Sequence, residues 1–122
     1  MKIILLAEDD DMSRDMLSRR LAKLGYGVIE ARNGAEAIDG ARTENPDLIL
    51  MDMCMPRMGG LEAVRKLKAD GNTARIPVIA LTALNTAEDV RGAVAAGCAA
   101  YETKPVALMK LNIKIRKLIG LV

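Results

Sequence analysis

The chain has 122 residues, of which 51% are hydrophobic and 28% are charged, which excludes a disordered polar segment and predicts one globular domain (residues 1–122). Eighteen Lys and Arg residues stand against sixteen Asp and Glu residues, so the charge gives no support for a nucleic-acid partner. No apolar run approaches the roughly 20 residues that span a bilayer, and two cysteines make neither a disulfide framework nor a metal cluster, so we expect a cytoplasmic protein without a membrane partner.

Five short apolar runs are expected to form strands. Three of them are almost continuously hydrophobic, which is typical of parallel strands that are covered on both faces. Because Phe and Trp are absent, we expect an aliphatic core in which methionines fill the gaps as packing residues. In chain order, the runs are Lys2–Ala7, Gly27–Ala31, Asp47–Asp52, Ile76–Leu81 and Ala99–Thr103.

An amphipathic helix is expected after each run. Gly25 and Gly97 stand where the first and fourth helices should end, since glycine adopts the left-handed backbone that terminates many helices, and Pro46 closes the second. The fivefold alternation predicts an α/β fold, a doubly wound parallel sheet in a three-layer sandwich with right-handed crossovers. The apolar helix positions are Met16, Leu17, Leu21 and Leu24; Ala37, Ile38 and Ala41; Leu61, Val64 and Leu67; Val90, Ala93, Val94 and Ala96; and Leu108, Leu111, Ile115 and Leu118.

Polar residues follow the apolar runs at their carboxyl ends, where a parallel sheet collects its ligand chemistry. Glu8 and Asp9 end the first run and Asp52 ends the third. Thr82 ends the fourth run and Lys104 follows the fifth. We therefore expect these five side chains at one edge of the sheet.

Three carboxylates at one edge repel one another unless a cation shares the site, and a hard divalent ion such as Mg²⁺ prefers oxygen ligands of this kind. Lys104 and Thr82 would add a positive charge and a hydroxyl suited to the oxygens of a phosphoryl group. The chain contains no His, and no Ser or Cys has an evident base beside it, so Asp52 is the expected nucleophile.

The sequence also resembles a known family, the receiver domains of response regulators in two-component signalling, in their stand-alone, chemotaxis-regulator-like form. The resemblance covers nearly the whole chain at the spacing of the family. It is carried by Leu5 to Asp9 with Arg14, by Pro46 to Asp52 with Met55-Pro56 and Met58-Gly59-Gly60, by Ile76 to Ala83, and by Gly97 through Tyr101 to Thr103-Lys104-Pro105.

The resemblance implies a flavodoxin-like (βα)5 fold with strand order 2-1-3-4-5, and a role for each matching position. Asp52 is the implied phosphoacceptor and Asp9 a direct Mg²⁺ ligand. Glu8 would reach the ion through water, and Cys54 would contribute its backbone carbonyl. Lys104 would pair with the phosphoryl oxygens, and the peptide bond after it, to Pro105, would be cis.

The resemblance also implies how the signal passes. Thr82 and Tyr101 would form a switch, in which the hydroxyl moves toward the phosphoryl group and the ring fills the vacated space. The implied phosphodonor is a sensor histidine kinase or a histidine phosphotransfer protein. The output would run through contacts with a downstream protein around the fourth helix, fifth strand and fifth helix. No effector domain and no turnover of an external substrate are expected, so the protein would not be an enzyme in the ordinary sense.

Three alternatives use the same fold or the same nucleophile. A phosphatase of the haloacid-dehalogenase type needs an acid two residues after its nucleophile, where this chain has Cys54, and its length leaves no room for a cap domain. A flavin-binding protein needs a phosphate-binding loop and aromatic walls, where this chain has acidic residues and two tyrosines. A pseudo-receiver would keep the fold and bind partners without phosphorylation; uptake of phosphate from acetyl phosphate distinguishes it.

Overall fold

The computed structural model describes residues 1–56, 58–83 and 86–121. In these ranges five parallel strands pair in the order β2-β1-β3-β4-β5, which confirms the predicted doubly wound, flavodoxin-like fold. None of the helices in these ranges has the length and apolar content that crossing a bilayer requires. The elements are β1 (Ile3–Ala7), α1 (Asp11–Lys23), β2 (Gly27–Ala31), α2 (Gly34–Glu44), β3 (Leu48–Asp52), α3 (Gly60–Ala69), β4 (Val78–Thr82), α4 (Ala87–Ala96), β5 (Ala100–Thr103) and α5 (Leu108–Leu118).

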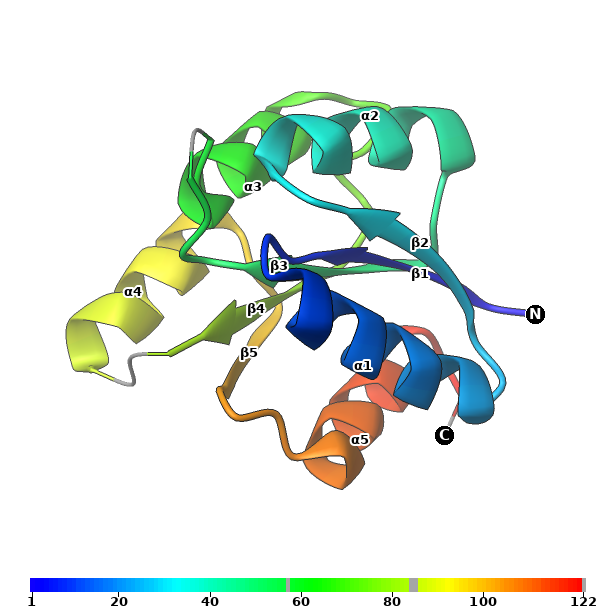
Figure 1. The fold of residues 1–122 in the computed structure, drawn as a ribbon. Helices are drawn as coiled ribbons and strands as arrows, with labels where there is room; N and C mark the ends of the chain where they lie inside the picture. Colours follow the sequence, from blue (N-terminus) through cyan, green and yellow to red (C-terminus); the bar gives the residue numbers. More distant parts are fainter. Residues whose placement is uncertain (57, 84–85, 122) are drawn as a thin grey trace.

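The helices cover the two faces of the sheet unequally, with α2, α3 and α4 on one face and α1 and α5 on the other (Figure 1). Successive strand residues point to opposite faces, so each strand contributes to both layers. In β3, Ile49 and Met51 pack toward α2, α3 and α4, whereas Leu48 and Leu50 pack toward α1 and α5. All five residues of this strand are buried, which explains its continuous hydrophobic run.

The predicted helix ends are confirmed where glycine marks them. α1 ends at Lys23, and Gly25 follows with a φ of 98°; Gly97 caps α4 with a φ of 112°. The fourth strand starts two residues later than predicted because Ile76 belongs to the preceding turn, where its N–H donates to the Thr73 carbonyl at 3.0 Å.

The expectation that the methionines are packing residues is wrong for several of them. Met51 and Met55 are buried, but Met12, Met16 and Met109 are 76%, 49% and 70% exposed. Adjacent helical residues are about 100° apart around the axis, so α1 directs Leu17 toward the core and leaves Met16 in solvent. The apolar stripe on α1 is therefore narrower than the sequence indicated.

Candidate functional site

Two buried carboxylates lie side by side at the carboxyl edge of the sheet. The β1–β3 register pairs Ala7 with Met51, so the residues that follow, Glu8 and Asp52, are neighbours. The two residues are 4% and 2% exposed, whereas the nearby Asp9 is exposed. One carboxylate oxygen from each of the three residues lies within 4.8 Å of the others. The structure thus brings together the three acidic residues that the sequence placed at strand ends.

Lys104 supplies the positive charge between the two buried carboxylates. Its Nζ atom lies 2.5 Å from Glu8 Oε1 and 3.2 Å from Asp52 Oδ2. Burial acts to lower the pKa of Lys104, but the hydrogen bond to Glu8 and the charges of Asp52 and Glu8 outweigh it and raise that pKa above its ordinary value. Lys104 is followed by a cis peptide bond to Pro105, as the resemblance implied.

The loop after β3 orients the Asp52 carboxylate from the other side. The backbone N–H of Cys54 donates to Asp52 Oδ1 at 3.1 Å, while the Met53 N–H donates to the Leu81 carbonyl at 2.9 Å and ties this loop to β4. The Cys54 side chain itself is exposed at the rim. Asp52 therefore has one carboxylate oxygen on a backbone amide and the other facing Lys104.

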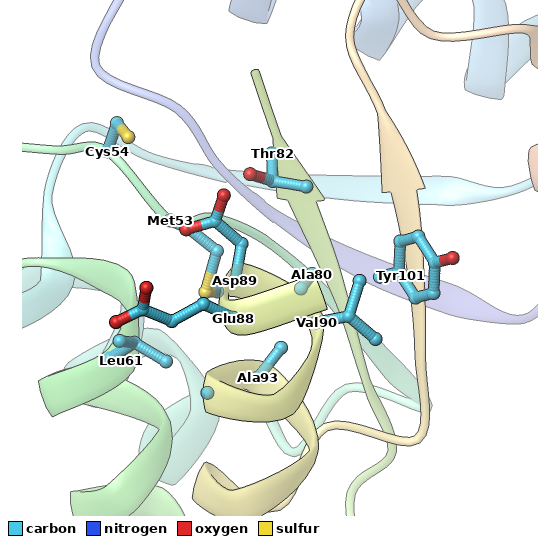
Figure 2. Close-up of a pocket in the computed structure, with 11 residues that line it drawn as sticks. Met53, Cys54, Leu61, Ala80, Thr82, Glu88, Asp89, Val90, Ala93 and Tyr101 are labelled. Atoms are coloured by element: carbon cyan, nitrogen blue, oxygen red, sulfur yellow. The ribbon is translucent and has the colours of Figure 1, made fainter. Parts of the chain in front are cut away.

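Thr82 and Tyr101 flank a cavity of about 370 Å³ between β4, β5 and α4. Thr82 is the last residue of β4, is buried, and follows Leu81, which pairs with Asp52. Tyr101 lies on β5 opposite Ala80 and is half-buried. In Figure 2 the Tyr101 hydroxyl points away from Thr82. The cavity is lined further by Met53, Leu61, Val90 and Ala93.

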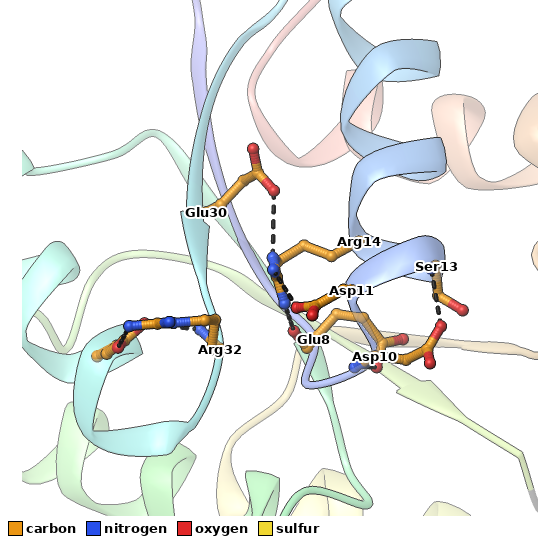
Figure 3. Close-up of polar contacts among 8 residues, drawn as sticks. Glu8, Asp10, Asp11, Ser13, Arg14, Glu30 and Arg32 are labelled. Atoms are coloured by element: carbon orange, nitrogen blue, oxygen red, sulfur yellow. Dashed lines mark hydrogen bonds and ion pairs between the residues drawn. The ribbon is translucent and has the colours of Figure 1, made fainter.

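Arg14 is a component of this edge to which the sequence assigned no role. From the first turns of α1, its guanidinium donates to the Glu8 carbonyl at 2.9 Å and to Asp11 Oδ1 at 2.6 Å (Figure 3). It also donates to Glu30 Oε1 on β2 at 3.2 Å, and its side chain is only 12% exposed. Arg14 therefore connects the loop between β1 and α1 (residues 8–10, the acidic loop) to α1 and β2. The sequence held two signals for it, the place of Arg14 in the family resemblance and its helical spacing of three residues from Asp11.

The donor set fits a hard divalent cation. All three side chains offer carboxylate oxygens, which Mg²⁺ prefers. The two oxygens of Glu8 already accept hydrogen bonds, from Lys104 Nζ at 2.5 Å and from the Asp10 N–H at 3.2 Å. The two oxygens of Asp52 are engaged in the same way, by the Cys54 N–H at 3.1 Å and by Lys104 Nζ at 3.2 Å, whereas the Asp9 carboxylate is exposed and open to an ion.

Comparison with known proteins agrees with this geometry. The family pattern of the response regulator receiver domain matches residues 4–116. The chain is 37% identical over 119 residues to the polar-differentiation response regulator DivK of Brucella anthropi, an alignment covering 98% of this chain and 97% of DivK.

Solved structures give the same result. The chemotaxis protein CheY4 of Vibrio cholerae superimposes with a TM-score of 0.91 at 28% identity, covering 97% of this chain and 98% of CheY4. The receiver domain of the Pseudomonas aeruginosa sensor histidine kinase PA1611, which has a magnesium ion in its active-site cleft, gives a TM-score of 0.91 at 34% identity and 98% coverage of both chains. By sequence and by fold, then, this chain belongs to the response regulator receiver domains of two-component signal transduction.

Proposed function

We propose that the protein is a Mg²⁺-dependent switch that takes a phosphoryl group from a phosphohistidine onto Asp52. The observation that carries the proposal is the setting of the Asp52 carboxylate. It lies 3.2 Å from Lys104 Nζ, accepts a 3.1 Å hydrogen bond from Cys54, and shares the edge with Glu8 and Asp9. A carboxylate held in this way is oriented for attack on phosphorus.

In the proposed reaction an Asp52 oxygen forms a bond to phosphorus as the bond from phosphorus to the histidine nitrogen breaks. The electron pair of that bond leaves with the donor histidine. Lys104, whose pKa is raised, stays protonated and faces the phosphoryl oxygens, and the Thr82 hydroxyl donates to another of them. Hydrolysis by water later releases inorganic phosphate and restores the Asp52 carboxylate.

Mg²⁺ would be held by Asp9 and Asp52 directly, by Glu8 through water, and by the Cys54 backbone carbonyl. When bound, it neutralises the negative charge that gathers between the carboxylates and the phosphoryl oxygens. Arg14 fixes the backbone of the acidic loop through the Glu8 carbonyl.

The cavity beside Thr82 supports a switch role for Tyr101. Movement of the Thr82 hydroxyl toward a phosphoryl group on Asp52 would enlarge the space into which the Tyr101 ring can turn. The signal then passes to a downstream protein through the α4–β5–α5 face, where Val94 is 63% exposed. The phosphodonor on this proposal is a sensor histidine kinase or a histidine phosphotransfer protein.

The test is intact-mass measurement after incubation with acetyl phosphate and Mg²⁺. We expect the wild type to gain about 80 Da, the mass of one phosphoryl group, and Asp52→Asn to gain nothing. Asp15→Asn makes the same change on the solvent side of α1 and serves as the matched control, which should gain mass like wild type. No mass gain in wild type, or a phosphoryl group on another residue, would refute the proposal. An unphosphorylated wild type would favour the pseudo-receiver alternative.

A further inference from the structure

Lys114 joins α5 to β5 through three contacts at one ammonium group. Its Nζ atom donates to the Tyr101 carbonyl at 2.7 Å and to Glu102 Oε2 at 2.7 Å. It also lies 5.4 Å from the centroid of the Tyr101 ring. Glu102 is 7% exposed, so its carboxylate is a buried charge whose counter-charge is this lysine. Lys114 is thus held against the residue that the proposed function identifies as the switch.

Two of these contacts do not depend on where the Tyr101 ring points. The Tyr101 carbonyl belongs to the β5 backbone, and Glu102 points to the other face of the strand, so both acceptors stay in place when the ring turns. The ammonium is therefore a fixed charge. A cation near a tyrosine ring attracts it, whereas a ring that turns toward Thr82 and the cavity moves away from this charge. The contact thus favours one of the two ring positions.

We propose that Lys114 is a positioning residue that holds the Tyr101 ring in its outward, resting orientation and so sets how readily the switch turns. The inference rests on the proposed role of Tyr101. Loss of the Lys114 charge raises the fraction of molecules whose ring is turned inward before any phosphoryl group arrives. Because energetic coupling between two sites is reciprocal, loss of the Lys114 charge also strengthens the binding of a phosphoryl analogue at Asp52.

A simpler role for Lys114 would be to neutralise Glu102 without acting on the ring. Removing Lys114 alone would leave the Glu102 carboxylate buried and unpaired, which destabilises proteins strongly. The informative comparison is therefore Glu102→Gln against the double variant Glu102→Gln with Lys114→Gln. Neither contains an unpaired buried charge, and they differ in whether a cation faces the Tyr101 ring.

The composition of the chain provides a clean reporter. The sequence has no Phe, Trp or His and only two tyrosines, so the aromatic region of the NMR spectrum contains the ring signals of two residues. The signals that disappear in Tyr101→Leu belong to Tyr101. Tyr26 donates to Asn112 Oδ1 at 2.5 Å and serves as an internal reference. Beryllium fluoride with Mg²⁺ is the phosphoryl analogue, and the Tyr101 shift at saturation defines the inward end point.

We expect the double variant to raise the ratio of inward to outward ring about two- to fivefold over Glu102→Gln, the range for a partly exposed cation–π contact. The beryllium fluoride midpoint should fall by the same factor. Lys114→Arg should behave like wild type, and so should Lys117→Gln, a matched charge removal on the exposed side of α5.

Equal Tyr101 shifts in Glu102→Gln and the double variant, without beryllium fluoride, would overturn the inference. This comparison needs no phosphodonor, so it stands even if Asp52 takes up no phosphoryl group. A different result would overturn both the switch role of Tyr101 and this inference. It is a wild-type Tyr101 shift that does not change with beryllium fluoride in a protein whose intact mass shows phosphorylation.

Discussion

Replacing Asp52 with Asn is expected to stabilise the metal-free protein. At an effective dielectric constant of about 20, Glu8 at no more than 4.8 Å repels Asp52 by about 3.5 kcal/mol or more, and Lys104 at 3.2 Å attracts it by about 5 kcal/mol. Asp9 repels Asp52 as well, but Asp9 is exposed and solvent screens its charge. The repulsion energy between Asp9 and Asp52 is therefore about half of that between Glu8 and Asp52. The charge–charge interactions of Asp52 therefore nearly cancel.

The desolvation of Asp52 then decides the sign. Asp52 is 2% exposed, and burying an ion costs several kcal/mol, of which the hydrogen bond from the Cys54 N–H restores only a part. An Asn side chain can keep that hydrogen bond without the buried charge. We expect a gain of about 1–2 kcal/mol in the free energy of unfolding, which raises the Tm of a domain of this size by about 4–8 °C.

The assay is thermal unfolding of wild type, Asp52→Asn, Asp9→Asn and the control Glu62→Gln, with and without Mg²⁺. At a concentration ten times its dissociation constant, Mg²⁺ should stabilise the wild type and Glu62→Gln by about 1.4 kcal/mol through mass action. The two variants at the site should gain much less, because each lacks one of the proposed Mg²⁺ ligands. A lower Tm for Asp52→Asn without metal, or equal Mg²⁺ shifts in all four proteins, would refute the reasoning.

Two further predictions concern the same edge, and a third compares the two cysteines. Lys104→Met should lower the free energy of unfolding, measured in urea, by about 3–5 kcal/mol because it leaves two buried carboxylates without a counter-charge. Adding Glu8→Gln should recover part of this loss, and a loss below about 1 kcal/mol for Lys104→Met would contradict the prediction. Arg14→Met should weaken Mg²⁺ binding about tenfold in calorimetry, since Arg14 fixes the acidic loop through the Glu8 carbonyl. The Mg²⁺ affinity of Arg14→Lys should fall between those of wild type and Arg14→Met, and an unchanged affinity in Arg14→Met would exclude this role. At about pH 8 a thiol reagent should modify the exposed Cys54 and spare Cys98, because burial raises the pKa of the Cys98 thiol to about 11; peptide mapping that finds equal labelling would be inconsistent with this.

The positions of Glu8 and Asp52 at one edge of the sheet could be predicted because the ends of the apolar runs can be located in the sequence. Parallel strands direct their carboxyl ends to one edge, so the residues after each apolar run had to meet there. Glu8 and Asp52 are neighbours for this reason, through the register of Ala7 with Met51. The same logic did not reveal that Lys104 contacts both carboxylates, because that contact depends on how far a flexible side chain reaches.

Contacts made by helices were the part that the sequence did not predict. Arg14 of α1 reaches Glu30 on β2, and Lys114 of α5 reaches Tyr101 and Glu102 on β5, so each contact joins two different elements and depends on how they pack. The exposed Met16 is a related case, since the rotation of α1 about its axis decides which of its apolar residues face the core.

The sequence by itself determined the alternation of strands and helices, the sheet that they build, and the residues that stand at the carboxyl edge of that sheet. Those features follow from local hydrophobic periods of two and 3.6 residues and from the chain direction of parallel strands. Only the tertiary structure decided the partners of Arg14, Lys104 and Lys114 and the outward orientation of Tyr101. Long side chains choose among many nearby acceptors, and that choice is made by packing between elements rather than by any local pattern.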